Sequence, residues 1–177
     1  MDTKQLLENL DNARKKYKPE NIKAVLVAEA PPDTIDRFFY YENVKKADYL
    51  FLGVIDILYP ELKEKYLKQR RNPKLKETIL KQLQSDGYYL LDLYELPISL
   101  NYEIDAIAIK RLVKNLSKIC QKNTPVILIK ANVYDSAYRH LKSKFNVIDR
   151  RISFPSTGNQ QKFKIEFTNA INEIASL

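Results

Sequence analysis

Hydrophobic residues follow two spacings along this chain, one typical of helices and one typical of buried strands. In residues 3–17 the apolar positions share one helical face, and Pro19 ends the pattern. These positions are Leu6, Leu7, Leu10 and Ala13. Residues 23–28 are almost wholly apolar and lead to the pair Pro31-Pro32. That run predicts a buried parallel strand followed by a loop.

The same alternation continues to the end of the chain. Residues 48–58 are apolar enough for a strand or a core helix, and we expect a helix because the amphipathic segment 61–81 continues it. Further strands are predicted at 88–94, 126–130 and 145–149, and further helices at 103–121, at 132–144 and from Phe163 to Ile174. This order predicts an α/β fold, a three-layer α/β/α sandwich with a mostly parallel four-stranded central sheet, in one domain over residues 1–177. Ligands of such folds bind where the strands end.

Charge and composition narrow the function classes. The 177 residues are 45% hydrophobic, which suffices for one core and excludes intrinsic disorder. The 30 Lys and Arg against 22 Asp and Glu give a net charge of +8, which favours an anionic partner, here DNA. The basic run from Lys63 to Lys81 either extends a DNA track or forms a solvated helix pair around Asn72-Pro73, and we prefer the helix pair.

The scarcity of cysteine and histidine limits the chemistry. Cys120 is the single cysteine, so intramolecular disulfides, iron–sulfur clusters and cysteine-based zinc sites are excluded. The single histidine, His140, shares a helical stripe that suits a helix surface better than a catalytic relay. No apolar run approaches the roughly 18 residues of a membrane span. We therefore expect a cytoplasmic protein that uses no metal, no cofactor and no membrane.

The loop after the first strand, residues 28–41, carries candidate chemistry. Its two prolines stiffen the backbone, so three carboxylates would be held at the rim of the sheet. They are Glu29, Asp33 and Asp36. Four aromatic residues follow, Phe38, Phe39, Tyr40 and Tyr41. They offer flat surfaces for stacking a base, at roughly 1–3 kcal/mol per base. Alternatively, at least two of the four fill the core.

Two later segments also follow predicted strands. Asp92 stands in an apolar strand, where a carboxylate is costly to bury, so it should face a site or a cationic partner, or form a structural salt bridge. The loop 150–162 combines cations, hydroxyls and amides before a helix, a pattern suited to phosphate binding. Its candidate ligand-binding residues are Arg150, Arg151, Ser156, Thr157, Asn159 and Lys162. An ordinary capped turn would use Ser153 or Ser156 and Gly158 as well.

Taken in order, five segments resemble motifs of the uracil-DNA glycosylase superfamily. Residues 25–32 resemble the strand and Gly-Glu-Ala-Pro-Gly type loop of its first motif, and 37–40 the segment that stacks on a flipped base. Residues 88–94 resemble the strand that carries a base-reading asparagine, here Asp92. Residues 126–133 resemble the strand and helix start written Leu-Gly-Ala-Thr-Ala, and 152–159 the His-Pro-Ser loop. The resemblance spans roughly residues 22–175.

This resemblance implies a protein that binds DNA, accepts an extruded base and, if it is catalytic, hydrolyses the N-glycosidic bond. Glu29 and Asp92 are then the catalytic candidates. The candidates for contact with the base are Phe38, Phe39, Tyr40 and Phe154. We expect the segments near positions 29, 92 and 154 to form the walls of one cavity.

Two departures from the motifs change what the resemblance implies. Phe154 stands at the position of the family's histidine, so the group that stabilises the leaving base is missing. Asp92 replaces the asparagine, and a carboxylate suits the exocyclic amine of adenine or cytosine better than the O4 oxygen of uracil. The alternatives are a catalytically inactive binding module of the same fold and an unrelated small-molecule or nucleotide-binding α/β domain.

Overall fold

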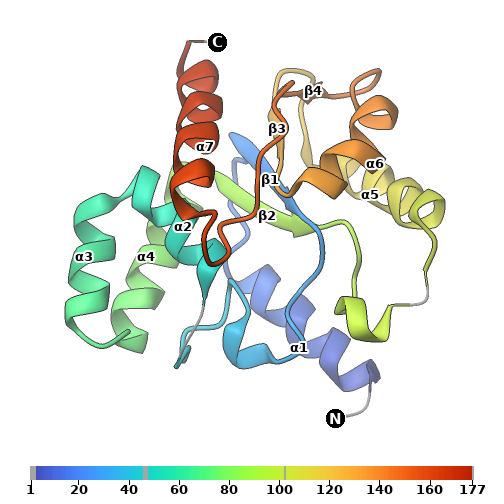
Figure 1. Ribbon diagram of the computed structural model, residues 1–177. Helices are drawn as coiled ribbons and strands as arrows, with labels where there is room; N and C mark the ends of the chain where they lie inside the picture. The colour runs from blue at the N-terminus through green and yellow to red at the C-terminus, as the bar shows by residue number, and fades with distance from the viewer. Residues whose placement is uncertain (1–2, 46–47, 102, 177) are drawn as a thin grey trace.

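A parallel sheet covered by helices on both faces organises the molecule (Figure 1). The computed structural model describes residues 3–45, 48–101 and 103–176, which contain four strands and seven α-helices. The helices are α1 (Thr3–Lys16), α2 (Tyr49–Leu58), α3 (Pro60–Lys68), α4 (Pro73–Asp86), α5 (Asp105–Ile119), α6 (Ala131–Leu141) and α7 (Gln160–Ala175). The strands are β1 (Ala24–Ala28), β2 (Tyr88–Asp92), β3 (Pro125–Leu128) and β4 (Asn146–Val147), and the short 3₁₀ helices are η1 (Ile35–Arg37) and η2 (Ile98–Leu100). The predicted three-layer α/β/α sandwich is confirmed.

The strands lie in the order β2-β1-β3-β4, and every pair is parallel. All five residues of β1 are buried, as expected for a strand that is covered on both faces. One apolar cluster joins β1 and β2 to α1, α2, α4 and α7, and a second joins the opposite face to α5 and α6. The sheet therefore separates two cores.

The elements match the sequence prediction closely, with shorter strands. Residues 49–58 form helix α2, as expected, and the basic run folds as the helix pair α3 and α4. Asn72 begins the second helix of that pair, because its side-chain oxygen accepts hydrogen bonds from the amides of Lys74 and Leu75, at 2.9 and 3.4 Å. The predicted strand 145–149 is reduced to two residues, Asn146–Val147.

The chain leaves neighbouring strands toward opposite faces of the sheet. β1 leads to α2, α3 and α4 on one face, whereas β2 and β3 lead to α5 and α6 on the other (Figure 1). Loops that part in this way open a crevice beyond the carboxyl ends of the strands. A parallel bridge between Ile129 and Ile152 brings the loop before α7 to the same edge.

Two glycines with the same backbone angle provide a test of the fold. Gly87 and Gly158 both have a φ of 85°, but a Cβ at Gly87 would lie 2.8 Å from the carbonyl oxygen of Asn21, while a Cβ at Gly158 meets nothing within 4 Å. We predict that Gly158→Ala lowers the free energy of unfolding by about 1 kcal/mol through backbone strain alone, and that Gly87→Ala lowers it by about 2–3 kcal/mol or more. Urea denaturation measures both, and equal losses would contradict the close packing of Gly87.

Candidate functional site

A cavity of about 150 Å³ lies beyond the carboxyl ends of β1 and β2. Four segments distant in the sequence line it: the loop after β1, the end of η1, the first turn of α2 and the end of β2, together with one residue from the loop before α7. Its aromatic residues are Phe38, Phe39, Tyr49, Phe51 and Phe154. Two carboxylates, those of Asp48 and Asp92, belong to the same lining.

Sheet register explains why these segments meet. Ala28, the last residue of β1, pairs with Asp92, the last residue of β2, so the chain after β1 starts beside this carboxylate. Phe154 lies two residues beyond the Ile152 bridge to Ile129. Of the three positions expected to wall one cavity, 29, 92 and 154, the last two line it, together with Phe38 and Phe39.

Glu29 lies outside this cavity, against our expectation. Its carboxylate accepts hydrogen bonds from the Lys130 ammonium and from the side-chain amide of Asn132, in the first turn of α6. Residues two apart in a strand point to the same face, and Glu29 lies two residues after Val27, which packs against the α5–α6 core. Ala30, one residue further along, lines the cavity. The alternation of the strand thus separates Glu29 from Asp92.

Lys130 holds an unusual backbone conformation at this edge. Its φ is 87° and its ψ is 133°, a region that strongly favours glycine. Lys130 belongs to the segment 126–133, which resembles the strand and helix start written Leu-Gly-Ala-Thr-Ala, and it takes the place of the glycine when residues 129–133 are aligned with those five. The ion pair with Glu29 gives the lysine side chain a partner in this strained position.

Asp92 is paired with Arg14, a residue that no sequence motif singles out. Arg14 in α1 donates from Nη2 to Asp92 Oδ2 at 2.6 Å, and the Asp92 side chain is only 3% exposed. The Arg14 guanidinium also lies 5.2 Å from the centre of the Phe38 ring. Burial raises the pKa of the Asp92 carboxyl, and the opposite charge of Arg14 counteracts that shift. The plain alternative stated for Asp92, a salt bridge, is therefore present within the cavity wall.

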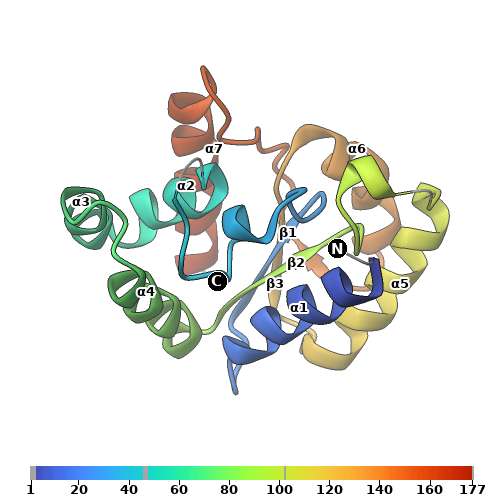
Figure 2. The ribbon, with the colours of Figure 1, turned by 90° about the horizontal axis from the view of Figure 1, so that it is seen from below.

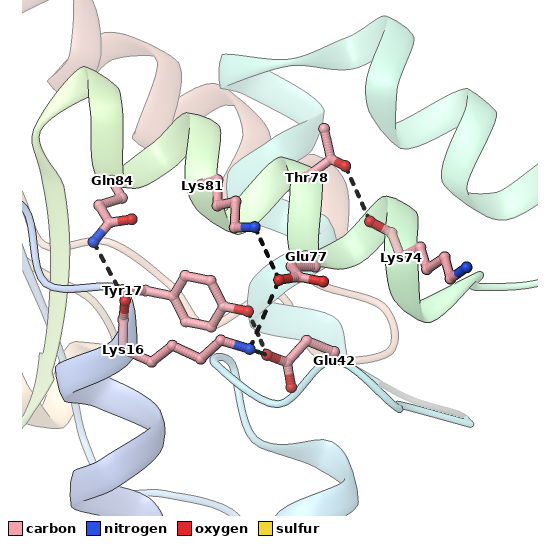
Figure 3. A network of polar contacts seen from close by, with 8 residues as sticks. All are labelled: Lys16, Tyr17, Glu42, Lys74, Glu77, Thr78, Lys81 and Gln84. Carbon is pink, nitrogen blue, oxygen red and sulfur yellow. Dashed lines mark hydrogen bonds and ion pairs between the residues drawn. The ribbon is translucent and has the colours of Figure 1, made fainter.

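The end of α1 is fixed two residues after Arg14 by a polar network (Figure 3). Lys16 Nζ lies 2.6 Å from the Glu42 carboxylate, which also accepts a hydrogen bond from the Tyr17 hydroxyl. From α4, Gln84 donates to the carbonyl oxygen of Lys18 at 2.9 Å. This network joins α1 to α4 and to the chain after η1, and α1 runs beside α5 (Figure 2). It thereby fixes the helix that presents Arg14 to Asp92.

The aromatic run divides between core and cavity. Phe38 and Phe39 are buried and line the cavity, so the alternative that at least two of the four fill the core is confirmed. Tyr40 does not line the cavity, contrary to its assignment as a base-contacting residue. Its hydroxyl accepts from the Leu90 amide at 2.7 Å and donates to the Leu90 carbonyl at 3.2 Å. Because β2 is an edge strand, its outer backbone groups lack a neighbouring strand, and Tyr40 provides hydrogen-bond partners for those of Leu90.

The second cavity carboxylate, Asp48, anchors a buried charge cluster. It accepts hydrogen bonds from the Tyr66 hydroxyl and from Arg71 Nε, both at 3.3 Å, and lies 3.8 Å from Lys76 Nζ. The Lys76 side chain is fully buried, with its ammonium 4.3 Å from the centre of the Phe51 ring. Burial lowers the pKa of Lys76 to about 7, although Asp48 opposes the shift. The prediction that the basic residues of this helix pair are solvated is therefore wrong for Lys76.

The predicted phosphate-binding loop keeps its cations on the surface, each beside a carboxylate. Arg150 pairs with Glu173 and Arg151 with Asp135, both at 2.8 Å, and Lys162 lies 4.0 Å from Glu166. Asn159 donates a hydrogen bond to Ser156 within the loop, and the Thr157 hydroxyl donates one to the Tyr49 hydroxyl of α2. Of this loop, only Phe154 lines the cavity. Phosphate binding by these residues stays a prediction.

The other residues that could carry chemistry have ordinary surroundings. His140 is exposed in the last turn of α6, as expected, and burial raises the pKa of the Cys120 thiol to about 11. In the described ranges, no three His, Cys, Asp or Glu residues are grouped so that they could hold a metal ion. Over the same part of the chain, no helix has the length and apolar character needed to cross a membrane.

Comparisons with known proteins add no assignment. No protein family, curated protein or solved structure matches this chain. The geometry of the cavity and the sequence motifs therefore carry the functional argument.

The buried Lys76 generates a test of the cluster beneath the cavity. Its pKa in the folded protein lies below the value of about 10.4 in an unfolded chain, so the unfolded state binds more protons between about pH 7 and 10. The contribution of Lys76 to stability therefore rises with pH in this window, by up to about 1.4 kcal/mol per pH unit. We predict that Lys76→Met reduces the slope of unfolding free energy against pH from 7.5 to 9.5.

Chemical denaturation at several pH values measures this slope. Lys74→Met is the matched control, because Lys74 is exposed on the same helix and its replacement should leave the slope unchanged. An identical slope in wild type and Lys76→Met would contradict a neutral lysine at this position.

Proposed function

We propose that this protein binds DNA and accepts an extruded nucleobase in the cavity beyond β1 and β2, as a divergent uracil-DNA glycosylase-like protein. The observation that supports this proposal most strongly is that three aromatic rings predicted to contact the base line the same cavity as a buried carboxylate, which was predicted to be catalytic and stands at the position of the family's base-reading asparagine. These residues are Phe38, Phe39, Phe154 and Asp92. Aromatic rings stack on any base, and a buried polar group fixes the orientation of the base.

The motif resemblance gains support from backbone geometry. Lys130 has the positive φ that a glycine adopts easily, at the place where the resembled motif has glycine. The loop of the first resembled motif lines the cavity through Ala30, Pro31 and Pro32. Both features lie in segments on which the resemblance rests, residues 25–32 and 126–133.

Charge supports a nucleic acid as the source of the base. The chain has a net charge of +8, and counterion release from phosphates would make its binding strongly salt-dependent. Arg37 lines the cavity, is exposed, and forms no ion pair with any described residue. A guanidinium in this position suits a phosphate next to an extruded nucleotide.

Binding without hydrolysis is favoured over base excision by the state of the two candidate catalytic carboxylates. Glu29 is paired with Lys130 on the other face of the sheet, and Asp92 is paired with Arg14. A general base needs a carboxylate that reaches a water beside the reacting carbon. Base excision remains the second candidate function, and base release from an oligonucleotide that the wild type binds would establish it.

The test of the proposed function compares two phenylalanines of similar exposure. We predict that Phe154→Ala weakens binding to an oligonucleotide with an unpaired base by about tenfold or more, because one stacking surface is lost. Phe145→Ala is the control, since Phe145 is half-buried as well but packs against the α5–α6 core. Fluorescence anisotropy measures the affinity over a range of salt concentrations.

Wild-type affinity should fall steeply as salt increases. Equal affinities of Phe154→Ala, Phe145→Ala and wild type would contradict base binding in the cavity. Binding that does not depend on salt would contradict DNA as the partner.

A further inference from the structure

We infer that the cavity selects a single six-membered ring that carries an exocyclic amine, the chemistry of cytosine, over uracil and over the purines. This inference rests on the proposed function and names the class of base that the same site takes. Two properties of the lining support it: the volume of the cavity, and the Asp92 carboxylate oxygen that accepts no hydrogen bond from a described residue.

The volume limits the ligand to one ring. The cavity measures about 150 Å³, and an apolar protein cavity of that size holds a molecule such as benzene. Its inner wall is buried, with Phe38, Phe39 and Phe51 each at most 6% exposed, whereas Arg37 in the same lining is exposed. The fused second ring of a purine would have to displace these core residues, which a close-packed interior resists.

The oxygen atoms of the lining select the edge of the ring. Arg14 donates a hydrogen bond to Asp92 Oδ2, whereas no described residue donates one to Oδ1. A carboxylate accepts hydrogen bonds and donates none, so Oδ1 pairs with an amine and repels a carbonyl oxygen. The amine at position 4 of cytosine meets this requirement, and the O4 oxygen of uracil does not. Because the Asp92 side chain is only 3% exposed, water screens the repulsion between Oδ1 and the O4 oxygen of uracil weakly.

Asp48 does not compete for the same amine. Its two oxygens already accept hydrogen bonds from Arg71 and Tyr66, and Lys76 lies beside it. The ligand therefore meets one open carboxylate oxygen in the cavity, which fixes a single position for the amine.

The experiment measures the affinity of the wild-type protein for oligonucleotides that differ in one base. Four duplex oligonucleotides carry cytosine, uracil, adenine or hypoxanthine at one position opposite an abasic site, so that pairing does not hold the target base. We expect cytosine to bind at least about tenfold more tightly than uracil, and adenine and hypoxanthine to bind more weakly than cytosine. An excess of free cytidine should displace the cytosine oligonucleotide, and an excess of uridine should not.

Asp92→Asn is the variant that isolates the carboxylate. An amide still accepts from Arg14 and can also donate to O4 of uracil, so the preference for cytosine should fall below about threefold. Asp149→Asn, an exposed aspartate outside the cavity lining, should keep the wild-type preference. Circular dichroism checks that both variants are folded. The comparison of bases with the wild-type protein does not depend on either variant.

The outcomes separate the inference from the proposed function. Equal wild-type affinities for cytosine and uracil, tighter binding of uracil or adenine, or displacement by uridine as effective as by cytidine would overturn the inference while base binding stands. The absence of salt-dependent binding to all four oligonucleotides would overturn the proposed function itself.

Discussion

The buried ion pair of Arg14 and Asp92 is the interaction on which the rest of the site depends. A carboxylate that is 3% exposed at the end of an edge strand is tolerated because a guanidinium lies 2.6 Å away. The pair also connects the first helix of the chain to the second strand, and Arg14 lies over Phe38, a wall of the cavity. Removing either charge would leave the other buried without compensation, so the shape and the polarity of the cavity are set together.

Much of the fold was predictable from local patterns. Apolar runs bounded by prolines and glycine marked β1, β2 and β3, and the strand ends of a parallel sheet meet at one edge, which is why Asp92 and Phe154 were expected together. The helix at 49–58 was inferred from what followed it in the chain. These inferences needed only spacing and chain order.

The remaining features depend on contacts between distant residues. Arg14 looks like any arginine of an amphipathic helix, because its partner lies 78 positions away. Lys76 belongs to a basic run whose other lysines are exposed or half-buried, and only Asp48 and Phe51 explain its burial. The prediction that Tyr40 contacts a base is wrong, because the sequence does not show that its hydroxyl bonds to the backbone of Leu90. Glu29 was misplaced because one residue along a strand reverses the face.

This division of the carboxylates separates recognition from hydrolysis. The cavity holds the groups that read and stack a base, while the carboxylate of the first motif is bonded to Lys130 and Asn132 on the α5–α6 side. A protein with this arrangement can retain a base-sized cavity without a free general base beside it. The strained Lys130 lies with Glu29 on the α5–α6 side. Its conformation therefore supports the ion pair with Glu29 and not the cavity wall.

Nuclear magnetic resonance of the protein titrated with cytidine tests the central claim most directly. With carboxyl carbons and phenylalanine rings labelled, the account predicts shifts of the Asp92 carboxyl and of the Phe154 ring, and unchanged signals from Glu29 and Phe145. Shifts confined to Glu29 or Phe145, or no shift at Asp92 at saturating cytidine, would contradict the claim that this cavity receives the base against Asp92.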